Sequence, residues 1–142
     1  MAQTLSKRFV YELSDTVERV VATEYDKDQV GSHPQGIDVS EMDRVSIFLQ
    51  NKGQDTIVFR VKPGPGDVDP DTGRRIFLEA AYTGYYEYTV PSGPDVYATV
   101  LWEFYPYFIV TGQASGNGPN TAVVYVDATD DPCRRFFFWG GC

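Results

Sequence analysis

Alternating apolar and polar residues recur in short runs along the chain and predict β-strands rather than helices. The clearest run, residues 44–50, places its apolar side chains on one face, and residues 56–62 repeat the pattern after a turn at residues 51–55. Two strands joined by a short turn that contains Asn and Gly are typical of a β-hairpin. We therefore expect these two strands to pair with each other.

Further strand-like runs follow at intervals near ten residues. They are expected at residues 8–13, 17–25, 75–81, 85–90 and 121–127, and on both sides of a bend at Pro106 within residues 96–110. Segments rich in Gly and Pro separate them, and proline cannot donate a hydrogen bond to a central ladder. Short strands at this spacing predict an all-β fold, either an antiparallel β-sandwich or a jelly roll.

Length and composition support a single β domain. The chain has 142 residues, of which 42% are hydrophobic and 15% aromatic, and it contains 13 Gly and 9 Pro. A domain of this size buries roughly 70% of its unfolded surface, which is enough for a packed core. We expect the sandwich at residues 9–128, an extended N-terminal arm at residues 1–8 and an aromatic C-terminal tail at residues 129–142.

The charge balance disfavours nucleic acid as a partner. The formal net charge is −8, and the 12 Lys and Arg residues are scattered singly or in pairs, so a phosphate backbone would be repelled. The chain has no run of about 18 apolar residues, and its N-terminus lacks the apolar core of a secretion signal. We expect no membrane span, no direct nucleic-acid binding, and synthesis in a cytoplasm.

The two cysteines lie close together at the C-terminus, at Cys133 and Cys142. Together with the single histidine, His33, they cannot supply the usual four zinc ligands unless carboxylates take part. Gly140 and Gly141 permit a tight return, so a disulfide between the cysteines is possible in an oxidising setting. In a reducing cytosol we expect two free thiols.

An acidic run contains the best metal candidate, formed by Asp67, Asp69, Asp71 and Glu79. A calcium loop wraps the ion with oxygens at fixed positions and needs a glycine for its sharp turn. Here the Gly and the Glu are each displaced by one residue from those positions. We favour the simpler interpretation, a polar hairpin turn in which Gly73 adopts a positive φ, and we expect no bound metal and no cofactor.

No group of residues predicts catalysis. His33 lies beside Ser32 in a loop sequence, but a catalytic triad needs a serine and a histidine brought together across the fold, with a carboxylate to orient the histidine. Glu103 lies among aromatic residues and is the nearest candidate for a raised pKa, although an outward-facing strand residue is the simpler explanation. We therefore expect a protein that is not an enzyme.

Four consecutive aromatic residues make the tail distinctive: Phe136, Phe137, Phe138 and Trp139. Successive side chains of an extended segment point to opposite sides, so these four cannot all enter the core of their own domain. We predict that they bind a partner. The aromatic residues between positions 97 and 108 fill the core in the simplest interpretation, and the alternative is a platform that stacks on sugars.

Three segments resemble small β-sandwich proteins of tailed-bacteriophage capsids, known as decoration or cement proteins. Residues 36–64, GIDVSEMDRVSIFLQNKGQDTIVFRVKPG, look like the opening of such proteins, and residues 88–100 and 121–129 are similar to later strands. The resemblance is one of pattern over residues 37–128, and no site residue can be carried over. It implies a structural virion protein that sits on the outer capsid surface, often as a trimer, and reinforces contacts between major capsid protein subunits.

The alternative is a carbohydrate-binding or receptor-binding virion module, such as a head fibre or an adhesion protein. Its expected signs are an exposed Trp102, exposed tyrosines and a calcium loop. The number of copies in an assembled particle would separate the two functions, because a cement protein follows the capsid lattice and an adhesion protein occupies a few special positions.

Overall fold

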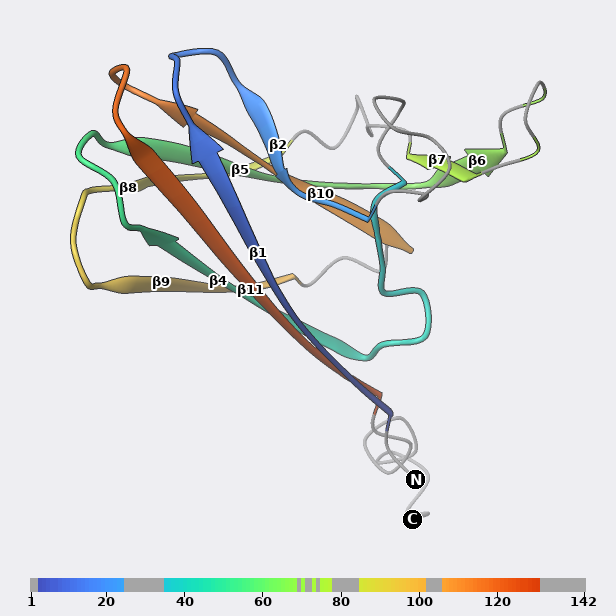
Figure 1. Ribbon diagram of the computed structural model, residues 1–142. Coiled ribbons are helices and arrows are strands. Elements are labelled where there is room, and N and C mark those ends of the chain that lie inside the picture. The colour runs from blue at the N-terminus through green and yellow to red at the C-terminus, as the bar shows by residue number, and fades with distance from the viewer. Residues whose placement is uncertain are drawn as a thin grey trace.

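Every regular element in the described part of the chain is a β-strand (Figure 1). The computed structural model describes residues 3–24, 35–68, 70, 73, 75–77, 85–101 and 106–130. The strands are β1 (Gln3–Leu13), β2 (Arg19–Ala22), β3 (Ile37–Asp38), β4 (Arg44–Asn51), β5 (Ile57–Gly64), β6 (Gly66–Val68), β7 (Arg75–Phe77), β8 (Tyr86–Val90), β9 (Val96–Leu101), β10 (Tyr107–Ala114) and β11 (Asn120–Asp130). The predicted all-β fold is confirmed.

Two antiparallel sheets pack against each other as a sandwich (Figure 1). Sheet A has the strand order β1-β11-β4-β9, and sheet B has the order β2-β10-β5-β8, with β3 also paired to β10. A separate two-stranded ribbon joins β6 to β7. As a result, β1 and β2 lie at one edge of the sandwich, and β8 and β9 lie at the opposite edge.

The predicted hairpin between residues 44–50 and residues 56–62 is wrong. Both segments are strands, but β4 pairs with β11 and β9, whereas β5 pairs with β10 and β8. The short connection between them carries the chain from sheet A to sheet B. Each strand buries one apolar face, and the two faces meet across the core. The prediction failed because alternation indicates a half-buried strand but does not fix which strand is its neighbour.

The core lies between the two sheets and is filled from both. Phe59 of β5 and Phe108 of β10 are its largest fully buried side chains. Phe59 lies opposite Gly112 in the ladder between β5 and β10. A Cβ atom on Gly112 would lie 3.1 Å from Val21 and 3.5 Å from Leu13, so side chains from the β1–β2 edge fill the space above this glycine and tie that edge to sheet B.

The ends of the sandwich differ from the expected boundaries. Residues 3–8, expected in an arm, belong to β1 and pair with β11 as far as Gln3 and Asp130. Leu5 packs against the core and lies opposite Ala128, which is buried. The sequence around Leu5 is polar and so suggests an arm. Only the pairing with β11, which is distant in sequence, brings this segment onto the sheet.

Two other local predictions are confirmed. The bend at Pro106 separates β9 from β10, which lie in different sheets. The acidic run begins in β6, which pairs antiparallel with β7, as expected for a hairpin. Gly73 has a φ of 71°, in the left-handed region expected for this turn.

Two buried asparagines hold the loops at one end of the sandwich. The Asn51 amide donates to the carbonyl oxygens of Asp55 at 2.6 Å and Val90 at 3.0 Å. The side-chain oxygen of Asn120 accepts from the backbone N–H groups of Gln54 at 3.0 Å and Asp55 at 2.8 Å. The two side chains therefore satisfy the backbone of the connection that crosses between the sheets.

Candidate functional site

The outer face of sheet A carries an apolar patch. Alternate residues of its strands point away from the core, and the register aligns them in rows across the sheet. We call this surface the sheet A patch; it consists of Val10, Phe48, Val96, Ala98, Val100 and Tyr125. Val10 and Val96 are each 48% exposed, Ala98 is exposed, and the other three are half-buried.

Polar residues frame the sheet A patch. Ser6 donates to the Asp127 carboxylate at 2.8 Å on one side of it, and Thr121 donates to Glu12 at 3.0 Å on the other. Arg8 lies over the Tyr125 ring, 5.7 Å from its centre, and its hydrogen bond to the hydroxyl lowers the pKa of Tyr125. An apolar centre with a polar rim is the composition of many protein-binding surfaces.

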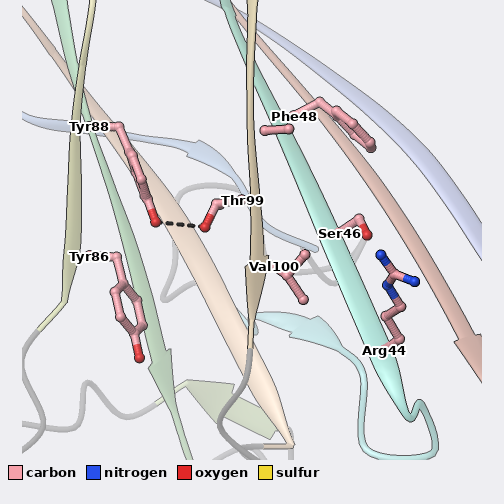
Figure 2. Close-up of a pocket in the computed structure, with 8 residues that line it drawn as sticks. Arg44, Ser46, Phe48, Tyr86, Tyr88, Thr99 and Val100 are labelled. Carbon is pink, nitrogen blue, oxygen red and sulfur yellow. Dashed lines mark hydrogen bonds between the residues drawn. The ribbon is translucent and has the colours of Figure 1, made fainter.

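A cleft of about 530 Å³ lies next to the patch, at the edge formed by β8 and β9 (Figure 2). Its lining comes from both sheets and consists of Arg44, Ser46, Phe48, Tyr86, Tyr88, Ala98, Thr99 and Val100. The Tyr88 hydroxyl lies 2.6 Å from Oγ1 of Thr99, so a hydrogen bond joins the two sheets across this edge. Phe48, Ala98 and Val100 belong to both the cleft and the patch, which together form one continuous surface.

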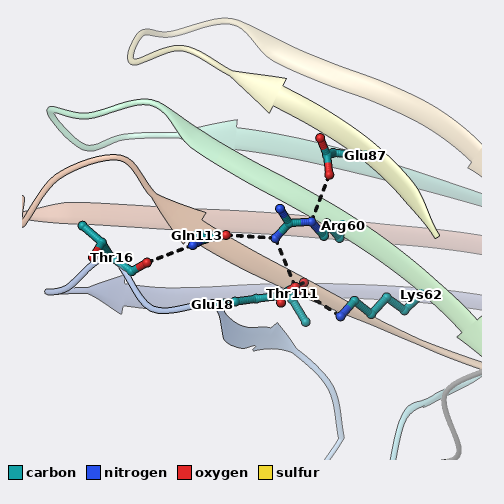
Figure 3. A network of polar contacts seen from close by, with 7 residues as sticks. All are labelled: Thr16, Glu18, Arg60, Lys62, Glu87, Thr111 and Gln113. Atoms are coloured by element: carbon teal, nitrogen blue, oxygen red, sulfur yellow. Dashed lines mark hydrogen bonds and ion pairs between the residues drawn. The ribbon is translucent and has the colours of Figure 1, made fainter. Parts of the chain in front are cut away.

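The outer face of sheet B carries an ionic network instead (Figure 3). The Glu18 carboxylate accepts from Oγ1 of Thr111 at 2.6 Å and forms ion pairs with Arg60 at 3.2 Å and Lys62 at 3.1 Å. Arg60 also binds Glu87 at 3.0 Å. This network ties the β1–β2 connection, which holds Glu18, to the centre of sheet B.

The network lowers the pKa of Glu18. Partial burial acts in the opposite direction, but the hydrogen bonds from Thr111 and Lys62 and the positive charges of Lys62 and Arg60 outweigh it. A carboxylate with a lowered pKa in the folded state stabilises the fold above its unfolded-state pKa, and this contribution is lost as the pH falls through the folded-state value. Glu18 therefore makes the fold acid-sensitive.

We expect the free energy of unfolding to decrease as the pH is lowered below 4.5, the ordinary pKa of glutamate. In Glu18→Gln this decrease should be smaller. At neutral pH the same substitution should lower the free energy of unfolding by about 1 kcal/mol. Melting curves between about pH 7 and pH 3 measure both effects. Glu12→Gln removes the same charge from the outer face of sheet A and serves as the control; equal pH profiles for the two variants would contradict the role given to Glu18.

Most of the sequence-predicted site residues lie outside the described part of the chain. Among the four calcium candidates, Asp67 lies in β6, and Asp69, Asp71 and Glu79 lie outside. The other candidates outside it are Ser32, His33, Trp102, Glu103, Cys133, Phe136, Phe137, Phe138, Trp139 and Cys142. Within the described residues, no three His, Cys, Asp or Glu side chains are grouped so that they could hold a metal ion, and no helix is long and apolar enough to cross a membrane.

The sheet A patch and the Glu18 network were not predicted from the sequence. A signal for the patch exists, because Phe48 occupies an outward position in the alternating run at residues 44–50. The network has no comparable signal, since Glu18, Arg60 and Thr111 are far apart in sequence and meet only when β2, β5 and β10 are neighbours.

Comparison with known proteins identifies no family. No family model matches the chain, and no curated protein matches it. One similar chain among solved structures is described by the words "Bacillus endospore appendages form a novel family of disulfide-linked pili"; it is 8% identical, with 92% of this chain and 89% of that chain covered and a TM-score of 0.47. A likeness at this score supports no inference about the function of this protein.

Proposed function

We propose that the protein is a structural virion protein without catalytic activity, which binds the outer surface of a tailed-phage capsid and reinforces contacts between major capsid protein subunits. The observation that carries the proposal is the sheet A patch. Exposed and half-buried apolar side chains on this face favour burial against another protein, and the polar side chains beside them keep the free protein soluble. A net charge of −8 works in the same direction.

The C-terminal tail supplies a second contact with the same partner in this proposal. β11 ends at Asp130, and the preceding residue, Thr129, pairs with Arg44, which lines the cleft. The described part of the chain therefore ends beside the proposed binding surface. Two linked contacts bind more tightly than either contact alone, provided that both can form at once.

Replacing Phe48 with aspartate is expected to weaken capsid binding by about tenfold or more, because it places a charge at the centre of the buried contact. Co-sedimentation of the purified protein with capsids that lack it measures the affinity. Thr89→Asp adds the same charge to an exposed position in β8, on sheet B, and should leave binding unchanged. Equal binding by both variants would exclude the sheet A patch as the docking surface.

Deleting residues 133–142 is expected to weaken capsid attachment sharply and to leave the melting temperature of the sandwich largely unchanged. Four large aromatic side chains bring roughly several hundred Å² of apolar surface, so even partial burial contributes several kcal/mol to binding. The same co-sedimentation assay, together with a melting curve of the truncated protein, tests this. Unchanged capsid attachment, or failure of the truncated protein to fold, would show that the tail packs into the core of the sandwich instead.

A sugar-binding virion module is the second candidate, and the tyrosines at the cleft are the observation that favours it. Tyr86 and Tyr88 both line the cleft, and Tyr86 is 38% exposed. Phenol rings stack on sugars and their hydroxyls form hydrogen bonds. Saturable binding of a host-surface polysaccharide, lost in Tyr86→Ala, would favour this function over capsid docking.

A further inference from the structure

The large apolar side chains that remain exposed gather at two opposite edges of the sandwich. Among the described residues, one group lies on β1 and the connection that follows it, and comprises Val10, Tyr11 and Val17. The other group lies on or beside β8 and β9, and comprises Tyr85, Tyr86, Val96 and Tyr97. Scattered exposed residues would need no explanation, but two matched groups on opposite edges indicate a contact that uses both.

One edge strand of sheet A, β9, lacks the usual protection against pairing. Natural edges are blunted by lysine, proline, bulges or very short strands. β9, residues 96–101, has the sequence VYATVL, with no charge and no proline. The other edge strand, β1, carries Lys7, Arg8 and Glu12, but it is 11 residues long and pairs without interruption along β11. Among the residues that the structure describes, each strand has one side that forms no ladder within its own sheet, and that side can accept another strand.

The topology makes the two edges complementary. Neighbouring strands of sheet A are all antiparallel, so β9 runs opposite to β1. A second copy moved sideways in the plane of the sheet keeps its strand directions, and its β1 therefore meets the first copy's β9 in the antiparallel orientation. The junction repeats the pairing found throughout the sheet.

The register also fits without any shift along the strands. Val10, Val123, Gln50 and Val96 form one continuous row across sheet A. The neighbouring row, whose side chains point to the opposite face of the sheet, consists of Phe9, Val124, Leu49 and Tyr97. Continuing these rows into a second copy places valine opposite valine and tyrosine opposite phenylalanine, and both are favourable cross-strand pairs.

We propose that β9 of one copy pairs with β1 of a second copy, so that sheet A continues across the contact. Val96 then lies opposite Val10, and Tyr97 lies opposite Phe9. The next two rows set Ala98 opposite Arg8 and Thr99 opposite Lys7, so no like charges meet. Pairing of β1 with β1 would leave Val96 and Tyr97 exposed, whereas the head-to-tail contact uses exposed residues from both edges.

This contact is heterologous, because each copy uses two different edges. Assembly therefore continues beyond a dimer, whereas a contact between identical edges would stop there. The contact does not depend on the proposed capsid function, since it needs only copies of this chain. It is tested with purified protein in the absence of capsids.

The test places opposite charges at the paired valines. Val96→Lys and Val10→Glu should each weaken self-association about tenfold or more, because each buries a charge against a valine. The double variant sets the introduced lysine of one copy opposite the introduced glutamate of the next, and should restore assembly to within about threefold of the parent, in a salt-dependent manner. Within one copy β11 and β4 separate the two positions, so the restoring pair can form only between copies.

Analytical ultracentrifugation over a range of concentrations gives the readout, and melting curves check that each variant folds. The parent should form species larger than a dimer. A parent that stays monomeric, a double variant that fails to recover, or a Val96→Lys variant that associates normally would each overturn the proposal. Normal self-association of Phe48→Asp alongside its loss of capsid binding would separate this contact from the docking surface.

Discussion

Replacing Asn120 with alanine is expected to lower the free energy of unfolding by about 3 kcal/mol or more. The side chain of Asn120 is fully buried, and its oxygen accepts from the backbone N–H groups of Gln54 and Asp55. Its amide donates to the Asp55 carboxylate at 3.0 Å and to the carbonyl of Gly116 at 3.3 Å. Alanine would remove all four hydrogen bonds at once and leave partly buried groups without these partners, which costs more than the loss of one exposed hydrogen bond.

Chemical denaturation of Asn120→Ala measures this effect, with Thr129→Ala as the control on the same strand. Thr129 is exposed, so its truncation should change stability by less than about 0.5 kcal/mol. Equal stabilities of the two variants would show that the loop backbone does not depend on Asn120. Because the affected loops join the two sheets, we also expect the loss to appear as one cooperative transition.

Truncating Phe59 to alanine is expected to destabilise the protein by about 3–5 kcal/mol. Phe59 is 0% exposed and lies on β5 between Gly112 of β10 and Tyr88 of β8. The glycine brings no side chain that could move into the cavity. The loss therefore combines the transfer of a phenyl ring to water with an unfilled space in the core.

The neighbouring residue provides a matched control. Val58 precedes Phe59 in β5, faces the other side of sheet B and is half-buried. Val58→Ala should cost about 1 kcal/mol, as measured by the same denaturation experiment. Equal losses in the free energy of unfolding for the two variants would contradict the assignment of Phe59 to the inner face of β5 and Val58 to the outer face.

The strands could be predicted from the sequence because each buries one face. Residues 44–50 and 56–62 alternate clearly, and both are strands. Their pairing could not be predicted, and Gly53 shows why. The local pattern places this glycine in a hairpin turn, but a Cβ atom there would lie 2.5 Å from Cα of Asn120, so it is needed because the opposite loop approaches closely. A contact with a residue so distant in sequence leaves no local trace.

The candidate surfaces were less predictable than the fold. Each outward strand position contributes one side chain, and Val10, Phe48 and Val96 gain meaning only when the order of strands in sheet A is known. The same holds for Glu18, whose partners lie on two other strands. The tail residues Phe136, Phe137, Phe138 and Trp139 stand out because four consecutive aromatic residues are unusual in any fold, and their role in binding remains a proposal.

The capsid function is tested most directly by the number of copies in purified particles that contain the protein. Quantitative mass spectrometry of such particles gives the molar ratio of this chain to the major capsid protein. We predict a fixed ratio set by the capsid lattice, reduced when residues 133–142 are deleted or when Phe48 is replaced by aspartate. Only a few copies per particle, at one capsid vertex or on the phage tail, would contradict the proposal that this protein reinforces the shell. A ratio that is unaltered by both the deletion and Phe48→Asp would contradict it as well.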